Sequence, residues 1–145
     1  MRRAREVRPA GQWDPAAAHD RVVLSADDRH RRRLALKTES GADVLLDLAE
    51  ATVLHDGDGL VLDDGRIVLI CGARETLIEI AAPSPLAFVR LAWHLGNRHT
   101  DVQIAGTKIR IRGDHVLEEM VKGLGGSVAH IEAAFDPEAG AHAAS

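Results

Sequence analysis

The first half of the chain consists of short apolar runs separated by turn residues. Strand-like patterns occur at residues 22–25, 33–38, 44–48, 60–62 and 67–70, and runs of this kind are typical of β-strands. An Asp-Gly pair lies between the last two runs, which indicates a β-hairpin. Residues 20–72 are therefore predicted to form a small all-β domain. Residues 1–19 lack such a pattern and are predicted to be a flexible leader.

The second half of the chain alternates strand patterns with two helical patterns. Its strand-like segments are residues 76–81, 102–105, 108–112 and 127–133. A first helix is expected over residues 85–95, because Ser84 is a favourable N-cap and proline is favoured at the first helical position. A second helix is expected after the N-cap Asp114. Its apolar residues have the spacing of a core-facing helix: Leu117, Met120, Val121 and Leu124.

The order of these elements, β-α-β-β-α-β, is the ferredoxin-like arrangement. The sequence therefore predicts an α+β fold, in which the small all-β domain is followed by a ferredoxin-like domain over residues 73–135. Residues 136–145 are rich in alanine and glycine and are predicted to be a mobile tail.

Composition narrows the range of functions. The 145 residues carry a net charge of −4, and only 3% of them are aromatic. Nucleic-acid binding requires a basic face, so the acidic balance argues against it. The one basic cluster, residues 29–33, directly follows two aspartates; it is either a patch for an acidic partner or a solvated strand or turn. No run of about 18 apolar residues occurs, so no membrane span is expected.

Cys71 is the only cysteine, which excludes a disulfide within the chain. It ends an apolar run and is expected to be a small buried residue rather than a reactive thiol. The residues after Met1 do not form the apolar segment of a secretory signal. The cytoplasm is therefore the expected location.

Histidine is the residue type that carries most chemical information. No serine nucleophile elbow and no phosphate-binding loop occurs in the sequence. The chain has eight histidines, but none of them forms a His-x-His or His-x-x-x-His pair, so no single segment chelates a metal. A metal site would have to be assembled from distant segments or from two chains.

His115 occupies a distinctive position in the first turn of the second predicted helix. The positive end of a helix disfavours a charged imidazolium, and a neutral imidazole is the form that binds a metal. Imidazole suits nickel, copper and zinc alike, so the ligand type does not select the metal. From these residues alone, an exposed histidine with no partner is the favoured interpretation, because one neutral imidazole is not a metal site.

Several motifs of the second half occur together in an order that is characteristic of one family. They are His94-Leu95-Gly96-Asn97-Arg98-His99, Val102-Gln103-Ile104, Ile109-Arg110-Ile111-Arg112, Asp114-His115-Val116-Leu117-Glu118-Glu119-Met120 and Phe135-Asp136-Pro137-Glu138-Ala139-Gly140-Ala141. In order and spacing, residues 74–141 resemble the C-terminal domain of the urease accessory protein UreE family. The first half is similar in layout to the family's N-terminal peptide-binding-like domain.

The resemblance implies a protein that is not an enzyme but a nickel metallochaperone, which donates Ni²⁺ during assembly of the urease metallocentre. It implies a homodimer formed by the ferredoxin-like domains, in which His115 of both chains holds one Ni²⁺. Zn²⁺ or Cu²⁺ would be alternative metals in vitro. The implied partners are the urease accessory GTPase and the urease maturation complex. The alternative is a scaffold for urease accessory proteins, with incidental metal binding.

The remaining histidines are ranked below His115. Tail histidines supply further ligands in the family, so His142 is an additional candidate ligand. His130, on the last predicted strand, is a weaker one. His99 is expected to have a structural hydrogen-bonding role at a helix end, and His94 and His55 are expected to be structural or exposed.

Overall fold

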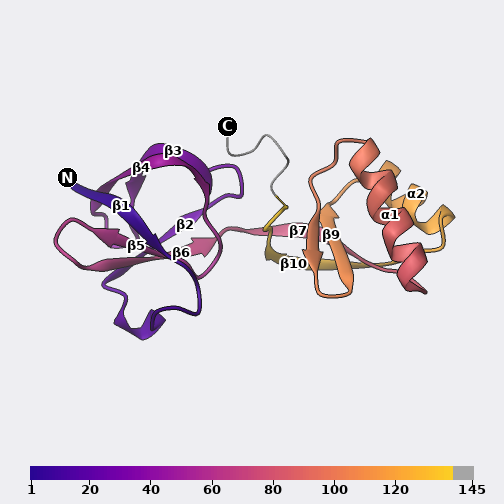
Figure 1. Cartoon of the computed structure of the whole chain (residues 1–145), viewed down its shortest axis with the longest axis horizontal. Coiled ribbons are helices and arrows are strands. Elements are labelled where there is room, and N and C mark those ends of the chain that lie inside the picture. Colours follow the sequence, from indigo (N-terminus) through magenta and orange to yellow (C-terminus); the bar gives the residue numbers. More distant parts are fainter. Residues whose placement is uncertain (139–145) are drawn as a thin grey trace. The chain divides into compact units, whose positions relative to one another are not determined.

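A computed structural model describes residues 1–138 of the chain. These residues form two compact units, Met1–Ala73 and Arg74–Glu138, which Figure 1 colours from indigo to pink and from pink to yellow. The border lies one residue from the predicted boundary. Each unit has a hydrophobic core of its own.

The first unit is built around a six-stranded sheet with the strand order β2-β6-β5-β1-β4-β3. Its strands are β1 (Arg2–Arg8), β2 (Asp20–Leu24), β3 (His30–Lys37), β4 (Asp43–Val53), β5 (Gly59–Leu62) and β6 (Ile67–Gly72), with a short 3₁₀ helix, η1 (Pro15–Ala17), between the first two. The β1–β4 and β2–β6 pairs are parallel, whereas β5 pairs antiparallel with both β1 and β6. The all-β first half predicted from the sequence is confirmed.

The prediction that residues 1–19 form a flexible leader is wrong. Strand β1 lies inside the sheet, between β4 and β5. The sequence pattern of β1 is hard to recognise because only Ala4 is buried and most of the other residues of the strand are charged. The next segment is also attached to the unit, since the Trp13 indole N–H donates a hydrogen bond of 3.2 Å to the carbonyl oxygen of Gly57.

The basic cluster at residues 29–33 does not form one exposed patch. Arg29 is almost fully buried, and its guanidinium donates a 3.4 Å hydrogen bond to the carbonyl oxygen of Leu54. The other arginines belong to strand β3 and are exposed. Arg31 forms an ion pair with Asp28 at 3.5 Å. Part of the cluster is therefore structural.

The second unit has the predicted order of strands and helices. Its elements are β7 (Arg74–Ala81), α1 (Pro85–Asn97), β8 (Gln103–Ala105), β9 (Lys108–Arg112), α2 (His115–Gly123) and β10 (Ser127–Ala134). The strand order β10-β7-β9-β8 and the antiparallel pairing of all neighbours are those of a ferredoxin-like sheet. The fold-class prediction is confirmed.

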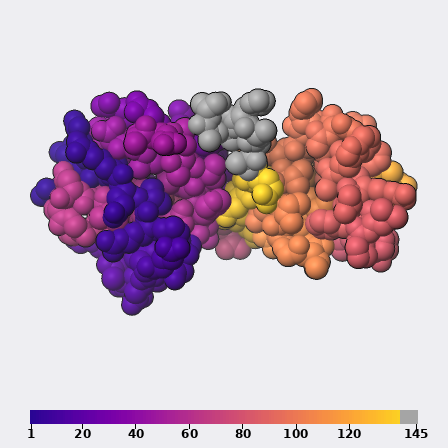
Figure 2. Space-filling view, in the orientation of Figure 1, coloured from indigo at the N-terminus to yellow at the C-terminus, as the bar shows by residue number. Residues whose placement is uncertain are grey.

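One face of this sheet forms the core with both helices. Alternate residues of β7 and β9 pack with apolar residues of α1 and α2: Ile78, Ile80, Ile109, Ile111, Leu91, Leu95, Leu117 and Val121. Both helices begin at the expected N-caps, because the Ser84 hydroxyl accepts the Ala87 N–H and the Asp114 carboxylate accepts the Leu117 N–H. In the space-filling view, α1 and the β8–β9 hairpin contribute much of the visible surface of this unit (Figure 2).

Within residues 1–138, none of the helices combines the length and the apolar character needed to cross a membrane.

Candidate metal centre at the start of helix α2

His115 is the first residue of α2, and its side chain is exposed. The backbone just before it is fixed, because the Gly113 N–H donates a 3.3 Å hydrogen bond to the carbonyl oxygen of Thr76 on β7. The neighbouring Asp114 carboxylate is used as the helix cap and accepts the Leu117 N–H at 3.0 Å. The backbone that carries His115 is therefore fixed, and the imidazole is exposed on it.

Within residues 1–138, the structure shows no complete metal site around His115. No group of three or more His, Cys, Asp or Glu side chains in this part of the chain could hold a metal ion. One imidazole is not a metal site, because stable sites for borderline metals combine several ligands. If His115 binds a metal, its ligand set is completed by another chain or by residues after 138.

Several large apolar side chains of α1 and α2 are exposed. Val116, the residue after His115, is 65% exposed, and Trp93 on α1 is 63% exposed. Because β7 and β9 are antiparallel, α1 ends and α2 begins at the same end of the unit. Leu86 and Val89 continue the exposed apolar surface along α1. Exposed apolar side chains that gather in this way indicate a contact surface for another protein.

A polar cavity of about 220 Å³ lies beside the start of α2. Arg112 lines it, and its guanidinium has Nε 2.9 Å from a Glu75 carboxylate oxygen and a terminal nitrogen 3.5 Å from Asp101. The cavity is lined by Thr100, Asp101, Arg112, Gly113, Asp114 and Leu117. The Asp101 carboxylate forms an ion pair with Arg112, and the Asp114 carboxylate caps α2. These lining residues therefore help to fix the backbone next to His115.

His130 is placed next to α2, but not as a free ligand. Its Nε2 lies 2.6 Å from Oε1 of Glu118, and the Lys122 ammonium lies 3.0 Å from Oε2 of the same carboxylate. The hydrogen bond with His130, followed by that with Lys122, holds the pKa of Glu118 below its ordinary value. Metal binding by His130 would have to compete with this pair.

The other candidate histidines have separate surroundings. His142 lies outside the described residues. His99 has a φ of +54° and donates its backbone N–H to the Gly96 carbonyl at 3.0 Å, so it forms part of the turn that ends α1. The His94 ring makes an edge contact with the Trp93 ring at a centroid distance of 5.0 Å.

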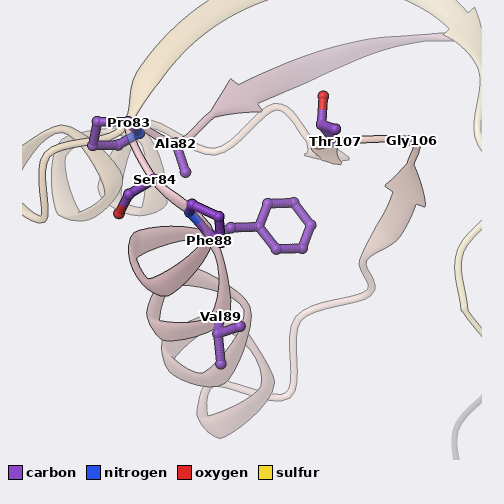
Figure 3. Close-up of a pocket in the computed structure, with 8 residues that line it drawn as sticks. Ala82, Pro83, Ser84, Phe88, Val89, Gly106 and Thr107 are labelled. Atoms are coloured by element: carbon purple, nitrogen blue, oxygen red, sulfur yellow. The ribbon is translucent and has the colours of Figure 1, made fainter.

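A larger groove of about 470 Å³ lies between the start of α1 and the β8–β9 turn. The Phe88 ring extends from α1 toward Thr107, with Val89 one residue further along the helix (Figure 3). Its lining is mostly apolar: Ala82, Pro83, Ser84, Pro85, Phe88, Val89, Gly106 and Thr107. No metal-ligating side chain lines it, so it is separate from the candidate metal centre.

Comparison with known proteins places both units in the same family. The family described as "UreE urease accessory protein, N-terminal domain" matches residues 2–73, and "UreE urease accessory protein, C-terminal domain" matches residues 75–145. The chain belongs to the UreE family of urease accessory proteins. A UreE family member takes part in urease maturation as an accessory protein and is not urease itself.

Individual relatives agree with this assignment over nearly the whole chain. The urease accessory protein UreE of Bradyrhizobium sp. (strain BTAi1 / ATCC BAA-1182) is 57% identical over 143 residues, which cover 99% of this chain and 69% of the relative. That of Beijerinckia indica subsp. indica is 49% identical over 145 residues, covering 100% and 83%. That of Ruegeria pomeroyi is 41% identical over 138 residues, covering 95% and 89%.

One group of contacts in this UreE chain was not foreseen from the sequence. Phe135 is fully buried, and the Arg112 guanidinium lies over its ring, 5.0 Å from the centroid. The Asp136 N–H donates to the Gln103 side-chain oxygen at 3.1 Å, and the Glu138 N–H donates to the Val102 carbonyl at 2.6 Å. The mobile tail predicted from residue 136 is thus wrong for residues 136–138, which these contacts hold. The signals in the sequence were a rare phenylalanine in an aromatic-poor chain and its place in the last of the family motifs.

Proposed function

We propose that this chain is a nickel-binding metallochaperone, which donates Ni²⁺ during assembly of the urease metallocentre. Membership of a urease accessory family supports a role in urease maturation. The observation that carries the proposal is the exposed His115 imidazole, which is fixed at a helix start and has no hydrogen-bonding or ionic partner among residues 1–138. An exposed imidazole on a fixed backbone is available for a cargo metal.

The proposed site lies between two copies of the chain. One imidazole per chain becomes two in a symmetric dimer, because a two-fold interface brings the same residue of both subunits together. The exposed Val116 and Trp93 support an interface at this end of the unit. His142 is proposed as an additional ligand, and His130 as a weaker one because Glu118 engages its ring.

The proposed partners follow from the role in urease maturation. They are the urease accessory GTPase and the urease maturation complex, with no nucleic acid or membrane as ligand. The proposed location is the cytoplasm, and a single cysteine, which excludes a disulfide within these 145 residues, is compatible with that reducing compartment.

Isothermal titration calorimetry of His115→Ala tests the site. The native chain should bind about one Ni²⁺ per dimer, and the variant should lose more than about tenfold in affinity, since even the supporting partners of metal ligands contribute that much. His55→Ala, an exposed histidine of the first unit, is the matched control and should bind as the native chain does. Parallel titrations with Zn²⁺ and Cu²⁺ measure selectivity. Unchanged nickel affinity in His115→Ala would show that the metal site is elsewhere.

The second candidate function is a scaffold for accessory proteins. The observation in its favour is that the first unit has a complete core of its own, while its described residues hold no cluster of metal ligands. Deletion of residues 1–73 separates the two functions. If urease activation in cells collapses while nickel affinity is retained, scaffolding by the first unit is the main role. If activation and nickel affinity are retained or lost together, metal delivery is the main role.

A further inference from the structure

Helix α2 carries a carboxylate on the same side as the His115 imidazole. Glu119 follows His115 by four residues, and both residues are exposed. Each residue of an α-helix adds a turn of about 100°, so Glu119 lies only about 40° around the helix from His115, one turn further along. Side chains four residues apart on a helix are neighbours, with Cβ atoms about 5–6 Å apart. One metal ion is therefore within reach of both side chains.

This side of α2 faces away from the core of the unit. Leu117 and Val121 are buried in that core, and the helical period places them on the side of α2 opposite His115 and Glu119. The exposed Val116 lies about 100° around the helix from His115 and about 60° from Glu119. Glu119 therefore lies between His115 and the apolar surface that is the proposed contact with a second copy.

The aspartates near the start of α2 are already engaged. The Asp114 carboxylate accepts the Leu117 N–H at 3.0 Å as the helix cap. The Asp101 carboxylate forms an ion pair of 3.5 Å with Arg112. Either aspartate would have to give up a contact that fixes the backbone next to His115 before it could bind a metal.

Glu118 is the nearest alternative to Glu119, because it follows His115 by three residues. Its Oε1 lies 2.6 Å from Nε2 of His130 and its Oε2 lies 3.0 Å from the Lys122 ammonium, so both oxygens have partners. The pKa of Lys122 is raised mainly by its hydrogen bond with Glu118, and the charge of Glu119 is the last of the causes. Within residues 1–138, the Glu119 carboxylate itself forms no hydrogen bond or ion pair. It is therefore the carboxylate beside His115 that a metal can bind without breaking a contact.

We propose that Glu119 is a metal ligand, and that the nickel site consists of the His115 imidazole and the Glu119 carboxylate of both chains. This inference rests on the proposed function, whose dimer supplies the second pair of ligands. A mixed set of nitrogen and oxygen ligands in a square-planar or tetragonal geometry is typical of Ni²⁺ and Cu²⁺. Carboxylate oxygen suits harder metals, whereas imidazole suits nickel, so the mixed set binds nickel less tightly than imidazoles alone. Such a balance fits a cargo metal that is passed on.

Calorimetric titration of Glu119→Gln with Ni²⁺ tests the ligand, and Glu118→Gln is the matched control. Both variants remove one negative charge from α2 and nearly keep the shape of the side chain. Glu119→Gln should weaken nickel binding by about tenfold or more, since even the supporting partners of metal ligands contribute that much. Glu118→Gln should leave nickel affinity nearly unchanged, because the field of a carboxylate that does not bind the ion is screened by salt. If both variants weaken nickel binding equally, Glu119 acts through its charge and the inference is wrong.

Glu119→His tests whether the side chain at position 119 reaches the metal. Two histidines four residues apart on one helix face bind one metal ion. Glu119→His should therefore bind nickel about tenfold or more tightly than Glu119→Gln does, and X-ray absorption at the nickel edge should show more imidazole scattering than in the native chain. The gain should disappear when His115→Ala is added. If Glu119→His binds nickel no better than Glu119→Gln, position 119 does not reach the metal and the inference is wrong.

Failure of this inference and failure of the proposed function give different results. If His115→Ala weakens nickel binding and Glu119→Gln does not, the proposed nickel site stands and Glu119 is not one of its ligands. If His115→Ala leaves nickel affinity unchanged, the proposed function loses its site, and the pairing of Glu119 with His115 is overturned with it.

Discussion

At the scale of single residues, the position of His115 follows from its neighbours in the chain. Asp114 caps α2 through the Leu117 N–H, and Gly113 is bonded to β7. The cap could be predicted from the sequence, because aspartate before an apolar helical pattern is a recognisable start signal. The contacts of Arg112 with Glu75 and Phe135 could not, since they join residues far apart in the chain and no local pattern encodes them.

Asp20, in the first unit, is the residue whose protonation the structure changes most clearly. Its carboxylate accepts hydrogen bonds from Ser40 and Thr38, and these lower its pKa from 3.8 to about 2. A lowered pKa in the folded state means that ionised Asp20 favours folding. Its contribution is complete above about pH 4 and is lost as the pH falls through about 2.

Replacement of Ser40 removes the largest cause of this shift. In Ser40→Ala, the pKa of Asp20 should rise toward 3.8, as followed by NMR titration of the carboxyl carbon. The free energies of unfolding of variant and native chain should differ near pH 6 and converge near pH 2, because protonated Asp20 no longer distinguishes them. Ser127→Ala, which changes an exposed serine of the other unit, should show no such convergence. A pKa of Asp20 that stays near 2 would contradict the assignment.

At the scale of elements, the sequence predicted both α-helices and every strand of residues 1–138 except β1, and it also missed the short 3₁₀ helix η1. The predicted elements have apolar residues at the period of a strand or a helix. In the structure, these apolar residues form the buried face of each element. Strand β1 has no such period, since it presents mainly charged side chains. Its place is decided by backbone pairing with β4 and β5, which depends on segments distant in sequence and leaves no local signal.

Strand β1 should therefore be essential for the first unit. Ala4 is fully buried and paired with Leu46 and Leu62, so Ala4→Asp would place a carboxylate in the core and cost about 3 kcal/mol or more of stability. Arg5→Asp changes the exposed neighbouring residue and should change stability by less than about 1 kcal/mol. Urea unfolding monitored by Trp13, which belongs to this unit, measures the difference. Equal stability of both variants would show that β1 is dispensable, as a flexible leader would be.

At the scale of the whole molecule, the chain consists of two units, and each of them matches its own domain of the UreE family. The sequence predicted their number and their border, because the change from strand patterns to mixed patterns is abrupt. It did not predict a complete metal site, and residues 1–138 do not contain one. A site completed by a second chain leaves no pattern in either copy beyond one exposed histidine and an exposed apolar surface next to it.

The proposed two-chain site makes nickel affinity depend on dimerisation, and Val116 allows this to be tested without touching a ligand. Val116→Lys places a charge on the exposed apolar surface beside His115 and should separate the dimer, because two symmetric lysines would meet at a two-fold contact. Light scattering should give the mass of a single chain, and nickel affinity should fall by more than about tenfold although His115 is intact. Val23→Lys, the same substitution at an exposed valine of the first unit, should leave both mass and affinity unchanged. A monomeric Val116→Lys chain that binds nickel as tightly as the native chain would show that one copy suffices, and the remaining ligands would then have to come from residues after 138.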